Sequence, residues 1–203
     1  MKKLFNGILL CTFVAAMIWF GGVLADRQRL NENVIRLHVV ADSDETQDQT
    51  LKLQVRDAVT EMLMQVMQDL ANADEAKAYI QDSLGLIQSV AENTLRSAGC
   101  DDPVTVTLEQ EAFDTRHYDT FSLPAGVYEA LRITIGSGEG KNWWCVVFPT
   151  LCYSAAGDEF EDTAAGAGFS DSVTDTLEGK DGYELRFFLL DVLGELENLL
   201  RFG

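Results

Sequence analysis

The sequence is poor in proline, histidine and basic residues. It has three prolines and two histidines in 203 residues, and its 15 Lys and Arg are set against 33 Asp and Glu, which gives a formal net charge of −18. A surface this acidic repels phosphate backbones and anionic headgroups. We therefore expect no nucleic-acid partner.

Motifs for metals and nucleotides are also missing. The sequence contains neither CxxC nor HExxH, the usual zinc signatures. Gly136, Gly138 and Gly140 alternate, but no helix is predicted after them to point its dipole at a phosphate. The acidic cluster at residues 42–48 lacks the order of a calcium loop and suits the first turn of a helix. We expect no cofactor and no metal.

One long apolar run opens the chain. Lys2 and Lys3 are followed by no charged residue from Leu4 to Ala25. A basic start, an apolar middle and small residues at the end are typical of a secretory signal, here cut before Asp26. The run is also long enough to remain in a bilayer as an anchor. Residues 1–25 are thus predicted to be a signal peptide or an N-terminal membrane anchor, with the rest exported in both cases.

The exported part has three cysteines, Cys100, Cys145 and Cys152. An oxidising compartment permits a disulfide between Cys145 and Cys152, provided that the backbone turns at Pro149. The alternative is three reduced cysteines that pack as small apolar side chains.

The hydrophobic pattern predicts an α+β domain over residues 26–152. Alternation predicts strands at 34–41, 104–113, 127–135 and 142–148, and helical spacing predicts helices at 46–70 and 74–98. Residues 136–141 read as the loop of a hairpin between the last two strands. We expect a four-stranded, largely antiparallel sheet in β-α-α-β-β-β-α order, covered by an antiparallel helix pair and a C-terminal helix.

Residues 153–203 consist of two regions with different composition. Residues 153–182 are acidic, small and aperiodic, which predicts a flexible linker. Residues 183–203 predict an amphipathic helix that packs on the core, although a membrane or a partner could take the same face and the scarcity of basic residues weakens the membrane option. The predicted packing face consists of Leu185, Phe188, Leu189, Val192, Leu196 and Leu199.

Two sets of polar and aromatic residues are candidates for function. His38 lies in the first strand, and Glu109, Glu111 and Asp114 are expected near His117, where acid and base roles are conceivable but a chance cluster is the better explanation. In the last strand the adjacent residues Trp143 and Trp144 must point to opposite faces. The outer one is either covered by the C-terminal part or is a binding anchor.

Three stretches are distinctive: IRLHVVADSDETQDQTLKLQVRDAV, SLPAGVYEALRITIGSGEGKNWWCVVFPTLC and YELRFFLLD. Together they resemble the stage II sporulation protein R family of endospore-forming Firmicutes. The resemblance implies a protein that is made in the forespore, passes into the space between the two membranes and triggers a membrane-embedded aspartic-type peptidase of the mother cell. That peptidase then matures the sigma-E precursor.

By that resemblance the protein is a signal and not an enzyme. The alternative is an exported hydrolase or cell-wall-binding protein that uses His38 or His117 with Cys145 or a carboxylate. The residues of the matching motifs that are expected to bind the peptidase are Arg36, His38, Asp42, Asp44, Lys52, Arg56, Asp57, Arg132, Asn142, Trp143 and Trp144.

Overall fold

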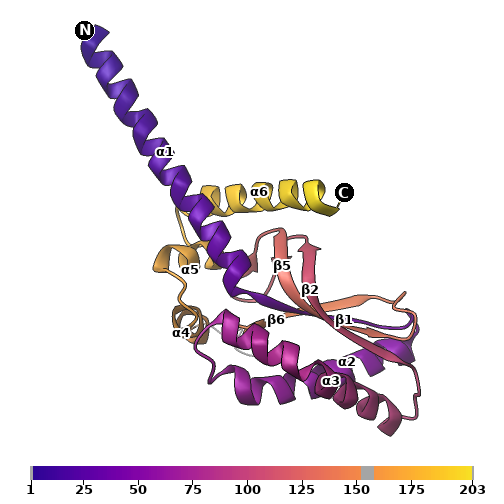
Figure 1. Cartoon of the computed structure of the whole chain (residues 1–203). Coiled ribbons are helices and arrows are strands. Elements are labelled where there is room, and N and C mark those ends of the chain that lie inside the picture. Colours follow the sequence, from indigo (N-terminus) through magenta and orange to yellow (C-terminus); the bar gives the residue numbers. More distant parts are fainter. Residues whose placement is uncertain (1, 152–157, 203) are drawn as a thin grey trace.

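The computed structural model describes residues 2–151 and 158–202. It is a mixed fold of helices around one main sheet, as the sequence predicts (Figure 1). The helices are α1 (Lys2–Asn33), α2 (Thr46–Met67), α3 (Ala73–Ser97), α4 (Asp158–Gly166), α5 (Asp171–Glu178) and α6 (Glu184–Phe202), and the strands are β1 (Ile35–Val40), β2 (Val104–Phe113), β3 (Arg116–His117), β4 (Ser122–Leu123), β5 (Gly126–Ile135) and β6 (Asn142–Phe148).

The apolar run forms the first part of α1, which projects from the rest of the protein (Figure 1). This helix is long and apolar enough to cross a membrane. It continues without a break past Ala25, and Val23, Asp26 and Leu30 are buried against the body. The projecting part and the folded part therefore share one helix.

The main sheet has the strand order β2-β5-β1-β6. β2 and β5 are antiparallel, β1 and β6 are antiparallel, and β1 and β5 are parallel. The largely antiparallel sheet is thus confirmed. The predicted hairpin between β5 and β6 is wrong, because β1 lies between them.

The reason for this order is the burial of β1 and the shape of the loop after β5. All six residues of β1 are buried, as suits a strand with neighbours on both edges. The loop wraps around the end of β1, where the amides of Glu139 and Gly140 donate to the carbonyls of Asp42 and Ala41. A Cβ at Gly140 would overlap the Ser43 carbonyl, so this close passage requires glycine.

Helices α2 and α3 cover one face of the sheet, and this predicted pair is confirmed (Figure 1). The side chain of Asn72 caps α3 by accepting from the amide of Glu75 at 3.0 Å. Apolar residues of both helices pack on alternate residues of the strands. The core on this side includes Leu37, Val39, Val55, Val59, Leu63, Ile80, Ile87, Leu131, Ile133 and Val147.

The other face of the sheet is partly covered by the end of α1 together with α4, α5 and α6. Residues 158–178 are therefore not the flexible linker that their composition suggests. They form α4 and α5, whose sparse apolar residues Phe160, Ala164, Val173 and Leu177 are all buried. A few large side chains at helical spacing are enough to hold such an acidic segment on the core.

Helix α6 forms where it is predicted but packs through the other side. Of the predicted packing face, only Leu189 is partly buried and the remaining residues are exposed. The buried positions are Leu190 and Gly194. Gly194 sits so close to β5 that a Cβ would overlap the carbonyl oxygen of Ala125. The missing side chain lets the helix backbone approach the strand, and this contact decides which side turns inward.

We predict that Gly194→Ala lowers the free energy of unfolding by about 1–3 kcal/mol, because its methyl group must push α6 away from the Ala125 carbonyl. The matched control is Gly85→Ala in α3, where a Cβ meets nothing within 4 Å. That variant should be unchanged or gain up to about 1 kcal/mol from helix propensity. Urea unfolding of the full chain in mild detergent measures both, and equal effects would contradict the close approach.

Candidate functional site

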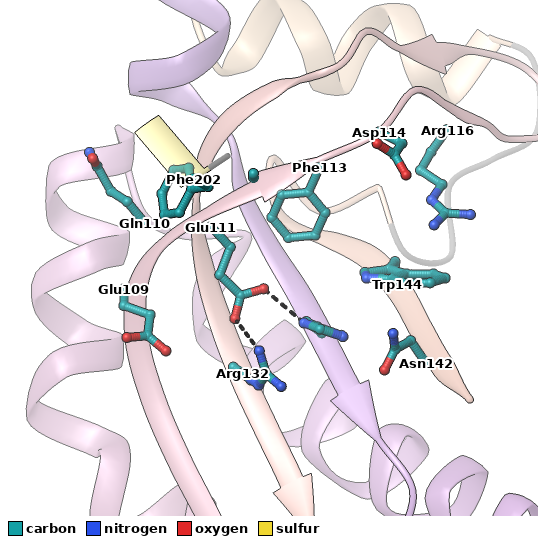
Figure 2. A pocket seen from close by; sticks show the side chains of 12 residues that line it. Glu109, Gln110, Glu111, Phe113, Asp114, Arg116, Arg132, Asn142, Trp144 and Phe202 are labelled. Carbon is teal, nitrogen blue, oxygen red and sulfur yellow. Dashed lines mark hydrogen bonds and ion pairs between the residues drawn. The ribbon is translucent and has the colours of Figure 1, made fainter. Parts of the chain in front are cut away.

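A cavity of about 490 Å³ opens on the face of the sheet away from α2 and α3, beside the part covered by α6. Strands β1, β2, β5 and β6 all contribute to it, and the last residue of α6 forms part of its rim (Figure 2). Its lining is His38, Glu109, Gln110, Glu111, Ala112, Phe113, Asp114, Arg116, Arg132, Asn142, Trp144 and Phe202.

The strand register brings three predicted residues together at one level of the sheet. His38 of the central strand pairs with Arg132 of β5 on one side and with Trp144 of β6 on the other. Residues that are directly paired across strands point to the same face. The three side chains therefore line the cavity in a row, and Asn142 follows on the same face of β6.

Glu111 links this row to β2. Its Oε2 lies 2.8 Å from Nδ1 of His38, and its Oε1 lies 3.3 Å from Nη1 of Arg132 (Figure 2). Burial alone raises the pKa of Glu111, but the hydrogen bond from His38 and the charges of His38 and Arg132 outweigh burial, so the pKa is lowered from its usual 4.5. The carboxylate is held ionised between two nitrogen donors.

Trp144 is half-buried in a stack of side chains. The His38 ring lies beneath it with the centroids 5.5 Å apart and the planes at 22°. On its other face the guanidinium carbon of Arg116 lies 3.7 Å from the ring centroid. The ring is thus covered by His38 and Arg116 and not by the described C-terminal part of the chain, and it still lines the cavity. Its role as a binding anchor stays a prediction.

Arg36 lies below this site and is completely buried. Its guanidinium carbon is 4.0 Å from the Phe113 ring centroid, and its Nη2 donates to the Tyr118 hydroxyl at 3.2 Å. Burial lowers the pKa of Arg36. The expectation that Arg36 contacts a partner is therefore wrong for this structure, because the side chain packs under the site and does not reach the surface.

Three other predicted residues lie at the opposite end of β1 and hold the loop after β5. Asp42 accepts from the amide of Ser137 at 2.5 Å, and this backbone hydrogen bond lowers the pKa of its carboxyl. Asp44 accepts from the amide of Lys141 at 2.7 Å, and Lys52 donates to the carbonyl of Lys141 at 2.9 Å. In this structure the three residues therefore stabilise the loop between β5 and β6.

The remaining predicted residues lie on the helix side of the sheet. Arg56 donates to the neighbouring Asp57 at 2.7 Å and lies 4.8 Å over the Trp143 ring. Trp143 packs against the core under α2 and α3. The two tryptophans thus point to opposite faces as predicted, and only Trp144 reaches the cavity.

The groups proposed for a hydrolase do not converge. His38 contacts Glu111, whereas Cys145 is buried in the core on the helix side of the sheet. His117 is exposed on the β3-β4 pair, where its Nδ1 is 2.8 Å from the hydroxyl oxygen of Ser122. The expected approach of Glu111 to His117 is wrong, since Glu111 reaches His38. The predicted Cys145–Cys152 bond lies outside the described residues, which exclude 152.

Sequence reasoning missed Phe113, Arg116 and Phe202 as parts of the site. Phe113 contacts both Arg36 and His38, and Arg116 covers Trp144. The local sequence around these residues does not predict their roles, because the roles depend on which strands are neighbours in the sheet. Within residues 2–151 and 158–202, no three His, Cys, Asp or Glu side chains are grouped as metal ligands.

The chain matches a protein-family model and a protein of known name. The protein-family model "Stage II sporulation protein R (spore_II_R)" matches residues 31–158. The chain belongs to this family. It is also 34% identical over 183 residues to the stage II sporulation protein R of Bacillus subtilis (strain 168), which covers 81% of this chain and 82% of that protein. No solved structure matches the chain.

The stage II sporulation protein R match covers the sheet, the helix pair and every cavity residue except Phe202. The apolar part of α1 and the helices α5 and α6 lie outside the matched residues. The family model therefore matches the scaffold and most of its cavity.

We predict that Glu111→Gln reduces the loss of stability at acidic pH. A carboxyl whose pKa is lowered on folding stabilises the protein above its unfolded pKa, here about 4.5, and loses that contribution as the pH falls through the lower folded value. Urea unfolding at pH 6 and pH 3 should thus show a smaller drop for Glu111→Gln than for the unchanged protein. The control is Glu109→Gln on the same strand, where the side chain is exposed. A drop as large in Glu111→Gln as in this control would contradict the prediction.

Proposed function

We propose that this protein is an exported signal that activates a membrane-embedded aspartic-type peptidase, which then processes the sigma-E precursor during endospore formation. Membership of the stage II sporulation protein R family supports the sporulation role. The apolar helix at the N-terminus fits a signal or anchor segment, which such an exported protein needs. The protein is made in the forespore and acts in the space between the two membranes.

The cavity is the surface that we assign to the peptidase, and one observation carries this assignment. Trp144 is half-buried at an open site, between a histidine and an arginine that hold it in place. Tryptophan and arginine in such a setting are the residue types that contribute most to protein recognition. His38 is itself buried and contributes by packing against Trp144 and binding Glu111.

The residue types around the cavity favour recognition over catalysis. Its described lining contains no serine, threonine or cysteine side chain that could act as a nucleophile. Glu111, the acid at the centre of the site, is held by His38 and Arg132. Binding at this surface would favour the active arrangement of the peptidase through a difference in affinity between its two states.

We predict that processing of the precursor depends on this protein. The full chain, the peptidase and the sigma-E precursor are co-expressed, and the processed fraction is measured by immunoblotting with and without the chain. Processing should rise at least about tenfold when the chain is present, the change that corresponds to roughly 1.4 kcal/mol of coupling. Equal processing in its absence would refute activation altogether.

We further predict that Trp144→Ala and Arg132→Ala each reduce this stimulation by at least about tenfold, since each removes a cavity group of the kind that dominates binding. The control is Arg96→Ala on α3, an exposed arginine on the opposite side of the sheet that pairs with Glu92. It should stimulate normally. Urea unfolding of each variant confirms that it is folded. If stimulation persists in both cavity variants, the peptidase binds elsewhere even though activation itself is retained.

A further inference from the structure

Helix α6 presents a continuous apolar face to the surroundings. Leu196, Leu199 and Leu200 are 51%, 69% and 77% exposed, and the face also includes Leu185, Phe188, Val192 and Phe202. Single exposed leucines are ordinary, but an uninterrupted row of large side chains along a helix marks a surface that is covered in use. The inward side of the same helix is already occupied by its contact with β5.

The position of α6 is fixed relative to α1. Arg186 forms an ion pair with Asp26, and Arg27 forms one with Glu197. Asp26 and Arg27 are the first charged residues after the apolar run of α1. These ion pairs, in which all four side chains are largely buried, therefore tie α6 to α1 at the point where the apolar run ends.

The exposed face of α6 is turned toward the side from which α1 projects. In Figure 1 α6 lies across the body at an angle to α1, with the sheet, α2 and α3 on its other side. Its buried residues contact β5, and Asn198 donates to the carbonyl of Phe113 at 2.8 Å. The apolar side, opposite these contacts, thus faces away from the sheet.

We propose that α6 is an interfacial helix that lies flat on the bilayer entered by α1, with its apolar face among the acyl chains. A helix that enters a bilayer through an apolar run crosses the surface where that run ends, and that is the level at which α6 is attached. An amphipathic helix parallel to the surface buries its apolar side at the boundary between headgroups and acyl chains. A lipid surface therefore fits this face in both chemistry and position.

The charges of the protein decide which headgroups suit it. The formal net charge is −18, and the exposed residues Glu184 and Glu195 lie beside the apolar face of α6. The two arginines of α6, Arg186 and Arg201, are paired with carboxylates. Attraction to anionic lipids is thus absent as a driving force, and burial of apolar surface drives the contact. It should form on zwitterionic phosphatidylcholine and change little with salt.

The test places a photoreactive benzoylphenylalanine at Leu196 in the full chain, reconstituted in phosphatidylcholine nanodiscs. The matched control has the same probe at Leu86 of α3, which is 55% exposed and lies on the opposite side of the body. After illumination, mass spectrometry measures the yield of lipid adducts at each position. A second probe at Phe188, on the same face of α6, checks the result independently.

We expect at least about tenfold more lipid adduct at Leu196 and Phe188 than at Leu86, with similar yields at low and high salt, because apolar burial is not screened. Adducts to a second copy of the chain at these positions would overturn the proposal in favour of self-association. Lipid adducts no more frequent than at Leu86 would also overturn it. Because the assay contains no peptidase, its outcome is independent of the proposed activation.

Discussion

The placement of β1 between β5 and β6 is the constraint on which the rest of the structure depends. A strand paired on both edges and buried on both faces must be apolar toward α2 and α3, and whatever it carries on the other face must be satisfied by its neighbours. His38 and Arg36 are on that other face, and Glu111, Trp144, Phe113 and Tyr118 surround them. The cavity is thus a direct product of the strand order, held by the loop that carries the glycines.

The two faces of the sheet have different tasks. The face under α2 and α3 is a closed apolar core, in which Cys145 is buried and against which Trp143 packs. The other face is divided: one part lies under α1, α4, α5 and α6, and the remaining part is open around Trp144. Because the covering helices come from both ends of the chain, the surroundings of the cavity depend on residues outside the matched family segment, and Phe202 at its rim is one of them.

The sequence predicts what local patterns control and misses what long-range contacts control. Alternation located the four long strands, and spacing located α2, α3 and α6. The hairpin was wrong because a glycine-rich connection has the same composition whether it turns back at once or passes around another strand. The inward side of α6 was wrong because a glycine at a close contact outweighs a richer apolar stripe, which hydrophobicity alone would place inside. His38, Arg132, Asn142 and Trp144 were named from the motif, but their meeting with Glu111 required the register.

The strand order also sets when the protein can fold. Residue 35 pairs with residues 129 and 148, so β1 is synthesised long before both of the strands that flank it. No stable sheet can form around β1 until the ribosome has passed the end of β6, and contacts so distant along the chain form slowly. A nascent chain with this strand order therefore keeps β1 without its partners until most of its length has been synthesised.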